Sequence, residues 1–172
     1  MSITLPRALS FPATIDEVSA RLVAGGVLII ATSFVLTGWK PLVAVLAYGF
    51  LARVLSGPRF SPLALLVTRG VRPRLAVAPR PVPGPPKRFA QGIGALLSTT
   101  ALVLALAGAA TGARIVIALI VGAAALESLA GFCVGCTIFA LLMRHGVVPQ
   151  SVCEACNDIS LRARQKRPVG AS

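Results

Sequence analysis

Long apolar stretches separated by short polar segments dominate this chain of 172 residues. The four most prominent run from Leu22 to Thr37, Pro41 to Ala52, Gly92 to Thr111 and Ile115 to Met143. A helix needs roughly 20 apolar residues to cross the hydrocarbon of a bilayer, and the third and fourth stretches supply them without help. The pattern therefore predicts four transmembrane helices, at about 15–37, 41–55, 87–111 and 114–144.

Residues that favour helix starts set the predicted boundaries. Thr14-Ile-Asp-Glu17 has the spacing of a capping box, with Thr14 as N-cap, and it extends the first stretch to spanning length. Ser61-Pro62 predicts a further short helix at 62–72, whose apolar side chains suit the headgroup plane of a membrane. The segment from Pro79 to Pro86 is rich in proline, and we expect it to be a stiff, extended connector.

Composition supports lipid as the main solvent of the chain. Hydrophobic residues make up 56% of it and charged residues 13%, where a soluble domain has about a quarter charged. The net charge of +12 would suit nucleic acid, but the cations lie between apolar stretches, and one Trp and one Tyr offer little base stacking. We therefore expect an all-α polytopic membrane protein with four transmembrane helices and an interfacial helix, contacting the lipid bilayer and no nucleic acid.

The cations are distributed unevenly along the chain. Lys40 alone lies in the first predicted loop and Arg114 alone in the third, while the remaining Lys and Arg lie in the two terminal parts and the second loop. Because cytoplasmic segments are enriched in Lys and Arg, we expect a protein of the cytoplasmic membrane with both termini inside the cell. The predicted organisation is a cytoplasmic segment at 1–14, a membrane domain at 15–158 and a basic tail at 159–172.

Glu127 is the only acidic residue within an apolar stretch. It could serve a proton or ion relay, but no second acid or base lines up with it, so a protonated Glu127 bonded to Thr32 or Ser33 is the favoured interpretation. On a continuous helix, Gly131 and Gly135 share its face and indicate close helix packing. Cys133 and Cys136 then point away from it, which disfavours a metal site that combines Glu127 with both thiols.

Two Cys-x-x-Cys pairs, Cys133/Cys136 and Cys153/Cys156, contain all four cysteines of the chain. Residues three apart on a helix share a face, so Cys133 and Cys136 are expected to lie close together. Ser151-Val-Cys-Glu154 predicts a short helix from about 152, and its N-terminus would favour the thiolate of Cys153. Helix 114–144 is longer than a bilayer requires, so we expect both pairs to meet at the cytoplasmic interface.

Three interpretations of these cysteines remain. The favoured one is a catalytic thiol relay, in which Cys133, Cys136, Cys153 and Cys156 exchange disulfide or persulfide with a cytoplasmic partner and no cofactor is needed. The spacing C-x2-C-x16-C-x2-C also fits a structural zinc site with all four cysteines as metal ligands. The third interpretation is packing alone, because a free cysteine behaves as a small apolar residue.

Several motifs together resemble a bacterial family known as domain of unknown function 4395, over 15–158. The motifs are Leu22-Val-Ala-Gly-Gly, Gly57-Pro-Arg-Phe-Ser-Pro-Leu-Ala, Pro83-Gly-Pro-Pro-Lys-Arg-Phe-Ala-Gln-Gly-Ile-Gly94, Gly131-Phe-Cys-x-Gly-Cys136 and Cys153-Glu-x-Cys-Asn157. The resemblance implies a four-helix membrane protein of a kind common in actinobacteria. It also implies thiol or sulfur metabolism, because such proteins accompany thioredoxin-like proteins and sulfurtransferases. It supplies no catalytic residues.

We therefore expect a membrane thiol protein that exchanges disulfide or sulfane sulfur with a thioredoxin-like or rhodanese-like partner. In this hypothesis Cys153 attacks, Cys156 resolves, and Cys133/Cys136 pass reducing equivalents or sulfur into the membrane. The alternatives are a zinc-stapled structural protein, a transporter subunit for a small sulfur-containing anion, which requires a homo-oligomer, and an anchor whose Pro-rich loop recruits a soluble enzyme. No enzyme class is assigned.

Overall fold

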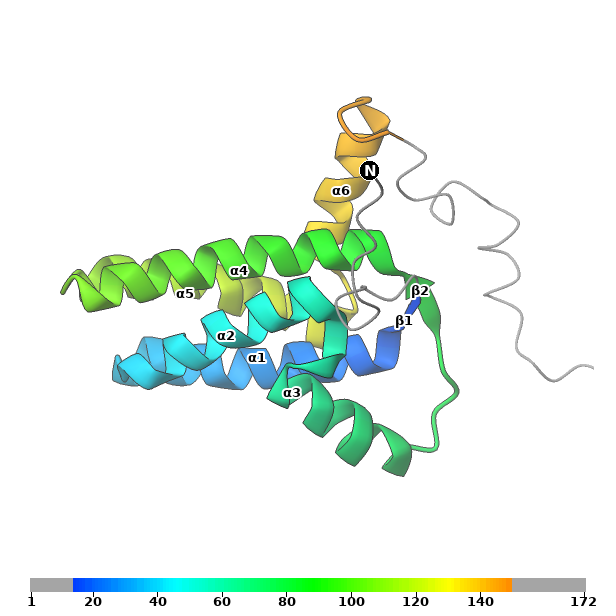
Figure 1. Ribbon diagram of the computed structural model, residues 1–172, viewed down its shortest axis with the longest axis horizontal. Helices are drawn as coiled ribbons and strands as arrows, with labels where there is room; N and C mark the ends of the chain where they lie inside the picture. Colours follow the sequence, from blue (N-terminus) through cyan, green and yellow to red (C-terminus); the bar gives the residue numbers. More distant parts are fainter. Residues whose placement is uncertain (1–13, 150–172) are drawn as a thin grey trace, which may run out of the picture.

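The computed structural model describes residues 14–149, and it is built from helices as predicted. Four long helices run side by side as a bundle (Figure 1). They are α1 (Glu17–Thr37), α2 (Lys40–Ser56), α4 (Gly84–Leu106) and α5 (Ala110–Ala125), the last continued by the π-helical turn η5 (Leu126–Ala130). The shorter helix α6 (Val134–Arg144) leaves the bundle at a steep angle (Figure 1).

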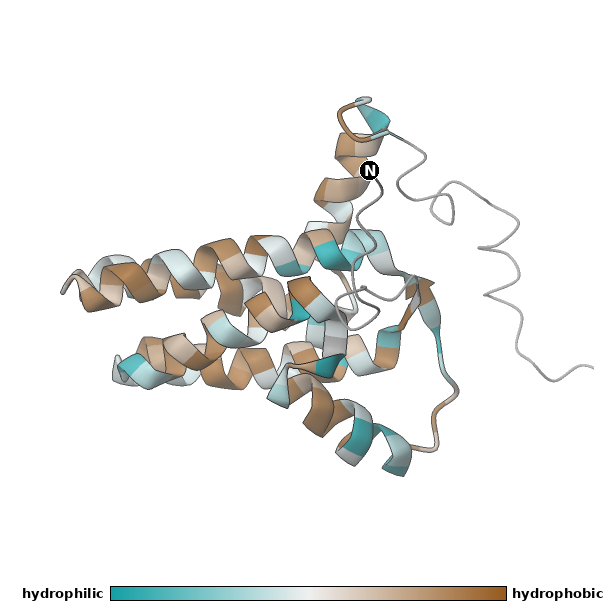
Figure 2. Cartoon of the chain, in the orientation of Figure 1, coloured by the Kyte–Doolittle hydropathy of each residue, from teal (hydrophilic) through white to brown (hydrophobic). Residues whose placement is uncertain are grey.

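Three of the helices are long and apolar enough to cross a membrane: Glu17–Thr37, Gly84–Leu106 and Ala110–Ala130. The long helices consist mostly of hydrophobic residues (Figure 2), and many of their large apolar side chains are exposed on the outside of the bundle. Ile29 is 69% exposed, Leu96 69% and Leu129 77%. A water-soluble fold rarely leaves so continuous an apolar surface uncovered, so this exterior suggests a membrane protein.

Small residues allow the helices of the bundle to approach one another closely. Ala31, Ala101 and Ala113 are fully buried between helices, together with Val43 and Ile117. In α4, a Cβ atom added at Gly94 would overlap the ring of Phe50 on α2. The contact between α2 and α4 therefore depends on a residue without a side chain at position 94.

The start of α1 differs from the predicted capping box. Thr14 lies in the short strand β1 (Thr14–Asp16), and Asp16 is the N-cap, accepting hydrogen bonds from the amide (3.2 Å) and hydroxyl (2.8 Å) of Ser19. Because β1 pairs in antiparallel fashion with β2 (Pro81–Pro83), the backbone is extended through Asp16, and the helix begins at Glu17.

The proline-rich segment also differs from the predicted spacer. Its middle part is β2, held against β1, and its last residues begin α4 at Gly84 rather than at 87. Pro85 and Pro86 fit the first turn of a helix, where no partner is needed for the missing N–H. With this earlier start, Lys87 ends the first turn of the helix rather than beginning it, and it is 8% exposed.

The predicted short helix at 62–72 is present and capped as expected. Ser61 caps α3 (Pro62–Leu65), and the helical path continues through η3 (Leu66–Val71) and η4 (Arg72–Arg74). Leu63 packs against α1 at Gly26, where an added Cβ would lie 2.6 Å from its Cδ1 atom. This helical segment is therefore docked onto the bundle.

The predicted single helix at 114–144 is wrong. The helix that begins at Ala110 ends at Ala130, and three non-helical residues precede α6. Gly131 has the left-handed conformation (φ 68°) that ends helices, and its N–H donates to Glu127 O (3.1 Å). From α1, Arg21 donates to Ser128 O (3.2 Å) and Leu129 O (2.9 Å), which satisfies carbonyls that the break leaves free. The third predicted helix likewise ends early, at Leu106 rather than 111.

Candidate thiol site at one end of the bundle

The break at Gly131 places Cys133 and Cys136 at the N-terminus of α6. Cys133 is the N-cap residue, Cys136 lies in the first turn, and both are half-buried free thiols. Their side chains hydrogen bond to each other. The amide groups and dipole at a helix N-terminus favour a thiolate, so the sequence places a vicinal dithiol where one thiol ionises readily.

A partly buried ion pair lies beside the two thiols. Lys87 in the first turn of α4 donates from Nζ to Oε1 of Glu127 on η5, at 2.5 Å. Both charges act electrostatically on Cys133 and on Cys136. The predicted partners of Glu127 are therefore wrong, and its partner is Lys87, the residue at which the third helix was predicted to begin.

The predicted separation of Glu127 from the thiols is also wrong. It assumed one continuous helix, whereas the turn at Gly131 redirects the chain so that Glu127 and Cys133 line the same cavity. Gly135 does lie at a close contact as expected, but with α4: an added Cβ there would be 2.5 Å from Cβ of Ala90. Gly131 turns the chain at the end of η5, and it does not mark the close helix contact that was predicted for it.

The two thiols have opposite acid–base character. The hydrogen bond from the Cys136 thiol lowers the pKa of Cys133 to about 7, helped by the nearby Lys87 ammonium and opposed by burial and by Glu127. The same bond raises the pKa of Cys136, and burial and the negative charge of Cys133 raise it further. Cys133 is therefore the thiol of the pair that ionises more readily, and Cys136 is the one that holds its proton more tightly.

Cys153 and Cys156 lie outside the described residues, so the proposed meeting of the two pairs stays a prediction. A four-cysteine zinc site needs both of them. Within residues 14–149, no three His, Cys, Asp or Glu side chains are grouped closely enough to hold a metal ion. Zinc binding is therefore a hypothesis that depends on the second pair.

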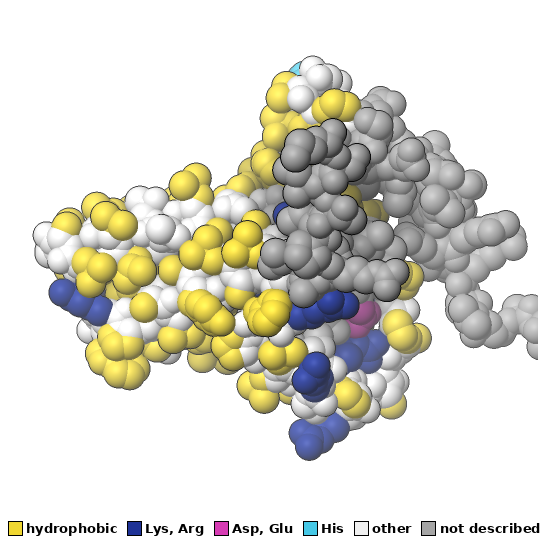
Figure 3. All heavy atoms as spheres, in the orientation of Figure 1, with side chains coloured by type: hydrophobic (Ala, Val, Ile, Leu, Met, Phe, Trp, Pro, Cys, Tyr) yellow, Lys and Arg dark blue, Asp and Glu magenta, His cyan; other side chains and the backbone are white. Residues whose placement is uncertain are grey.

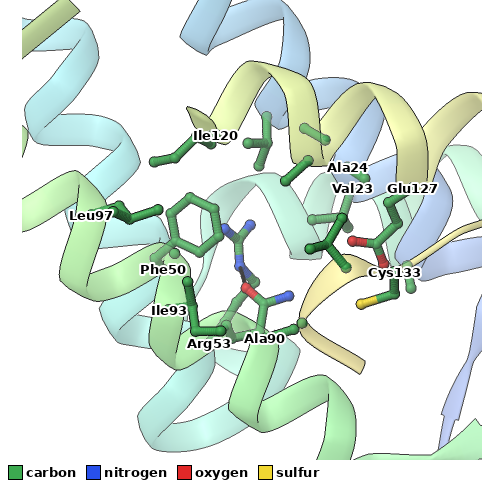
Figure 4. Close-up of a pocket in the computed structure, with 18 of the residues that line it drawn as sticks. Val23, Ala24, Phe50, Arg53, Ala90, Ile93, Leu97, Ile120, Glu127 and Cys133 are labelled. Atoms are coloured by element: carbon green, nitrogen blue, oxygen red, sulfur yellow. Dashed lines mark hydrogen bonds between the residues drawn. The ribbon is translucent and has the colours of Figure 1, made fainter. Parts of the chain in front are cut away.

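A cavity of about 110 Å³ opens between α1, α2, α4 and α5 next to Cys133. Most of its wall is apolar, and Arg53 of α2 extends into it (Figure 4). The sulfur of Cys133 and the carboxylate of Glu127 lie across the cavity from Arg53 (Figure 4). Arg53 is 5% exposed, although its charge and its place near a helix end predict a side chain that reaches the surface.

The dithiol lies toward the cation-rich end of the bundle. In Figure 3 the dark blue side chains gather around α3 and the start of α1, and a single group marks the opposite end. That far end is where Arg114 lies against Gly38, at the turn between α1 and α2. The dithiol, the ion pair and the buried arginine thus belong to the basic end.

The fold and this site define a helical protein with three potential membrane spans and a vicinal dithiol at the end of the bundle. The chain belongs to the family described as "Domain of unknown function (DUF4395)", whose model matches residues 15–144. This confirms the family resemblance of the motifs. Searches of curated proteins and of solved structures found no match to the chain.

Proposed function

We propose that the protein is a membrane thiol protein that exchanges disulfide or sulfane sulfur with a cytoplasmic thioredoxin-like or rhodanese-like partner. The observation that supports this most directly is the ionisable Cys133 at the N-terminus of α6, hydrogen bonded to Cys136 and beside Lys87. A lowered thiol pKa with a second thiol in reach is the arrangement that thiol–disulfide exchange uses.

The exchange has two steps. The Cys133 thiolate attacks one sulfur of the partner's disulfide, forming a mixed disulfide and releasing the other partner sulfur as a thiolate. Cys136 then loses its proton and attacks Cys133 Sγ, releasing the second partner sulfur. The partner gains two electrons, and the dithiol becomes a Cys133–Cys136 disulfide. With a persulfide partner, Cys133 instead takes the outer sulfur and the partner leaves as a thiolate.

The placement in the membrane belongs to the same proposal. We place α1, α2, α4 and α5 across the cytoplasmic membrane, with the basic end and both termini in the cytoplasm. The helix from Pro62 to Arg74 then lies at the headgroups, and the dithiol at the level where a soluble partner can reach it. In the full chain, Cys153 attacks the partner's disulfide first and Cys156 resolves. The resulting Cys153–Cys156 disulfide then takes the place of the partner's disulfide in the two steps at Cys133 and Cys136, and the second pair returns to its thiol form.

Counting released thiols tests the chemistry of the described pair. In a chain with Cys153→Ser and Cys156→Ser, the chromogenic disulfide DTNB should release two equivalents of thionitrobenzoate, because Cys136 resolves the mixed disulfide. Cys136→Ser should release one equivalent and retain a stable adduct on Cys133. Cys133→Ser should react far more slowly, because the remaining thiol is protonated.

Equal rates for the Cys133→Ser and Cys136→Ser chains would contradict the assignment of Cys133 as nucleophile. The zinc alternative has its own measurement in the unmodified chain. One tightly held zinc per chain, with all four thiols unreactive until a chelator is added, would replace exchange with a structural role.

A further inference from the structure

We infer that the cavity between α1, α2, α4 and α5 is a binding site for a small, weakly hydrated monovalent anion, held by the guanidinium of Arg53. Arg53 and the cavity wall would hold the anion, and the cysteines are not needed for its binding. It is therefore independent of thiol exchange, except for the coupling to Cys133 described below.

The contacts of Arg53, which lines the cavity, leave one of its donors buried without a partner. Nε donates to Oε1 of Gln91 (2.9 Å), and the guanidinium lies over the ring of Phe50, 4.5 Å from its centroid. Nη1 is buried and has no hydrogen-bond partner among the residues that the structure describes. A buried, charged donor without an acceptor is costly, and a bound anion removes that cost.

The charges around the cavity do not balance. Lys87 and Glu127 form an ion pair and neutralise each other. The other two acidic residues of the described chain, Asp16 and Glu17, do not line the cavity, and Asp16 is bonded to Arg72. Arg53 thus contributes one positive charge that no carboxylate of its own compensates. While Cys133 keeps its proton, the site therefore lacks a single negative charge.

The cavity wall selects the kind of anion. Apart from Arg53, Gln91, Glu127 and Cys133, it is formed by apolar side chains and glycine. An anion that enters must give up its water to such a wall, which penalises strongly hydrated and divalent ions such as sulfate and phosphate. A volume of about 110 Å³ admits an ion of a few atoms. Thiocyanate, iodide and hydrosulfide have the required chemistry.

Binding there should also affect Cys133, which lines the same cavity. A bound anion and the Cys133 thiolate are two negative charges that share the nearby cations, so each disfavours the other. The anion is therefore expected to suppress ionisation of Cys133. This coupling rests on the proposed function, because it assumes that Cys133 acts as a thiolate.

The test is equilibrium dialysis of radiolabelled thiocyanate against the full, reduced chain in detergent micelles. We expect saturable binding of one equivalent per chain, displaced by iodide and not by equal concentrations of sulfate. Arg53→Met should lower the affinity at least tenfold. Arg69→Met, which removes an exposed cation of η3, should leave it within twofold.

Non-saturable binding, or displacement by sulfate as effective as by iodide, would overturn the proposal, and both are measured on the wild-type chain even if Arg53→Met does not fold. Equal affinity of a folded Arg53→Met chain would overturn it as well. Cys133→Ser should still bind thiocyanate, so a failure of thiol exchange leaves the site intact. If alkylation of Cys133 is unchanged at saturating thiocyanate, the coupling to the thiol is wrong.

Discussion

The hydrogen bond from Cys136 has the largest effect on the pKa of Cys133, and two opposite charges beside the thiol modify it. Lys87 favours the thiolate and Glu127 disfavours it, and the ion pair between them holds both at fixed positions. The hydrogen bond from Cys136 adds to the effect of Lys87. The reactivity of Cys133 is therefore adjustable by single substitutions that leave both sulfurs in place.

Lys87→Met should raise the pKa of Cys133 above about 7, because it removes the cation and leaves Glu127 unpaired. A rise of one unit lowers the thiolate fraction at pH 7 about fivefold, and the rate of iodoacetamide alkylation with it. Glu127→Gln should change the rate in the opposite direction. Lys40→Met, at the far end of the bundle, is the matched control. A rate unaffected by Lys87→Met would show that the ammonium does not act on this thiol.

Asp16 joins three segments through its carboxylate. It caps α1 through Ser19, accepts from Nε of Arg72 (2.6 Å) and accepts from the amide of Arg80 (2.9 Å). Burial raises its pKa, but these hydrogen bonds outweigh burial and lower it to about 2. The carboxylate form therefore ties the start of α1 to the helical segment before β2.

Stability should depend on pH through Asp16. Because its pKa is lower in the folded state, its contribution is fully present above the ordinary value near 4 and is lost as pH falls toward 2. Thermal unfolding at pH 5 and at pH 2.5 measures this dependence. The loss of stability between the two pH values should be smaller in Asp16→Asn than in wild type. Identical losses in the two chains would mean that the carboxylate contributes no pH-dependent stability.

At the scale of elements, the turn at Gly131 decides where the thiols lie. It ends η5, lets α6 start in a new direction, and is supported by Arg21 from α1. Without that turn, α5 would continue past Cys133, and the thiols would face away from Glu127. The arrangement of the site therefore depends on the left-handed conformation of Gly131 and on the hydrogen bonds from Arg21 that support it.

Gly131→Ala should destabilise the fold by about 1–2 kcal/mol, because a side chain disfavours the left-handed conformation. It should also slow alkylation of Cys133 by displacing it from Lys87. Gly122→Ala is the control, since an added Cβ there has open space around it and α5 is helical. That change should be neutral or stabilise by up to about 1 kcal/mol. Equal stability of both variants would contradict the role given to the turn.

The contact between α2 and α4 offers a second matched pair of glycines. Gly94→Ala should cost about 1–3 kcal/mol, because its Cβ overlaps Phe50 and the helices must separate. Gly92→Ala, two residues earlier and with nothing near its Cβ, should cost nothing. Unfolding of the two variants in detergent measures these changes in stability. Since Phe50 supports Arg53, Gly94→Ala should also weaken thiocyanate binding, whereas Gly92→Ala should not.

At the scale of the whole molecule, an apolar exterior is combined with a basic end. The exterior needs lipid, and the basic end suits an anionic cytoplasmic leaflet. In the proposed orientation, the dithiol lies near a membrane surface rather than at the bilayer centre. A soluble partner can then reach it without entering the hydrocarbon.

Labelling from outside the cell tests this orientation. In a chain whose four cysteines are replaced by serine, Arg69→Cys should resist a membrane-impermeant maleimide on intact spheroplasts and react after lysis. Thr111→Cys, exposed at the start of α5, should react on intact spheroplasts. The reverse pattern would place the basic end outside and remove a cytoplasmic partner from the proposal.

Periodicity and caps predicted much of the fold and less of the site. The long helices and the short helix after Ser61 follow from apolar length and helix-start residues, which act locally. The site depended on contacts that no local pattern contains. The sequence predicts Lys87 as the first residue of its helix, whereas the structure begins α4 at Gly84 and buries Lys87. The place of Arg53 near a helix end predicts a surface cation, whereas packing of α4 against α2 buries it.

The sequence by itself determined an all-helical chain of the DUF4395 family, with apolar helices suited to lipid and a dithiol near the end of the last long helix. These properties follow from composition and from spacing within one element. Only the tertiary structure decided that Gly131 turns the chain, that Lys87 pairs with Glu127 and that Arg53 faces a cavity beside Cys133. The reason is physical: the burial and pairing of a charge depend on neighbours brought together by folding, which their order along the chain does not reveal.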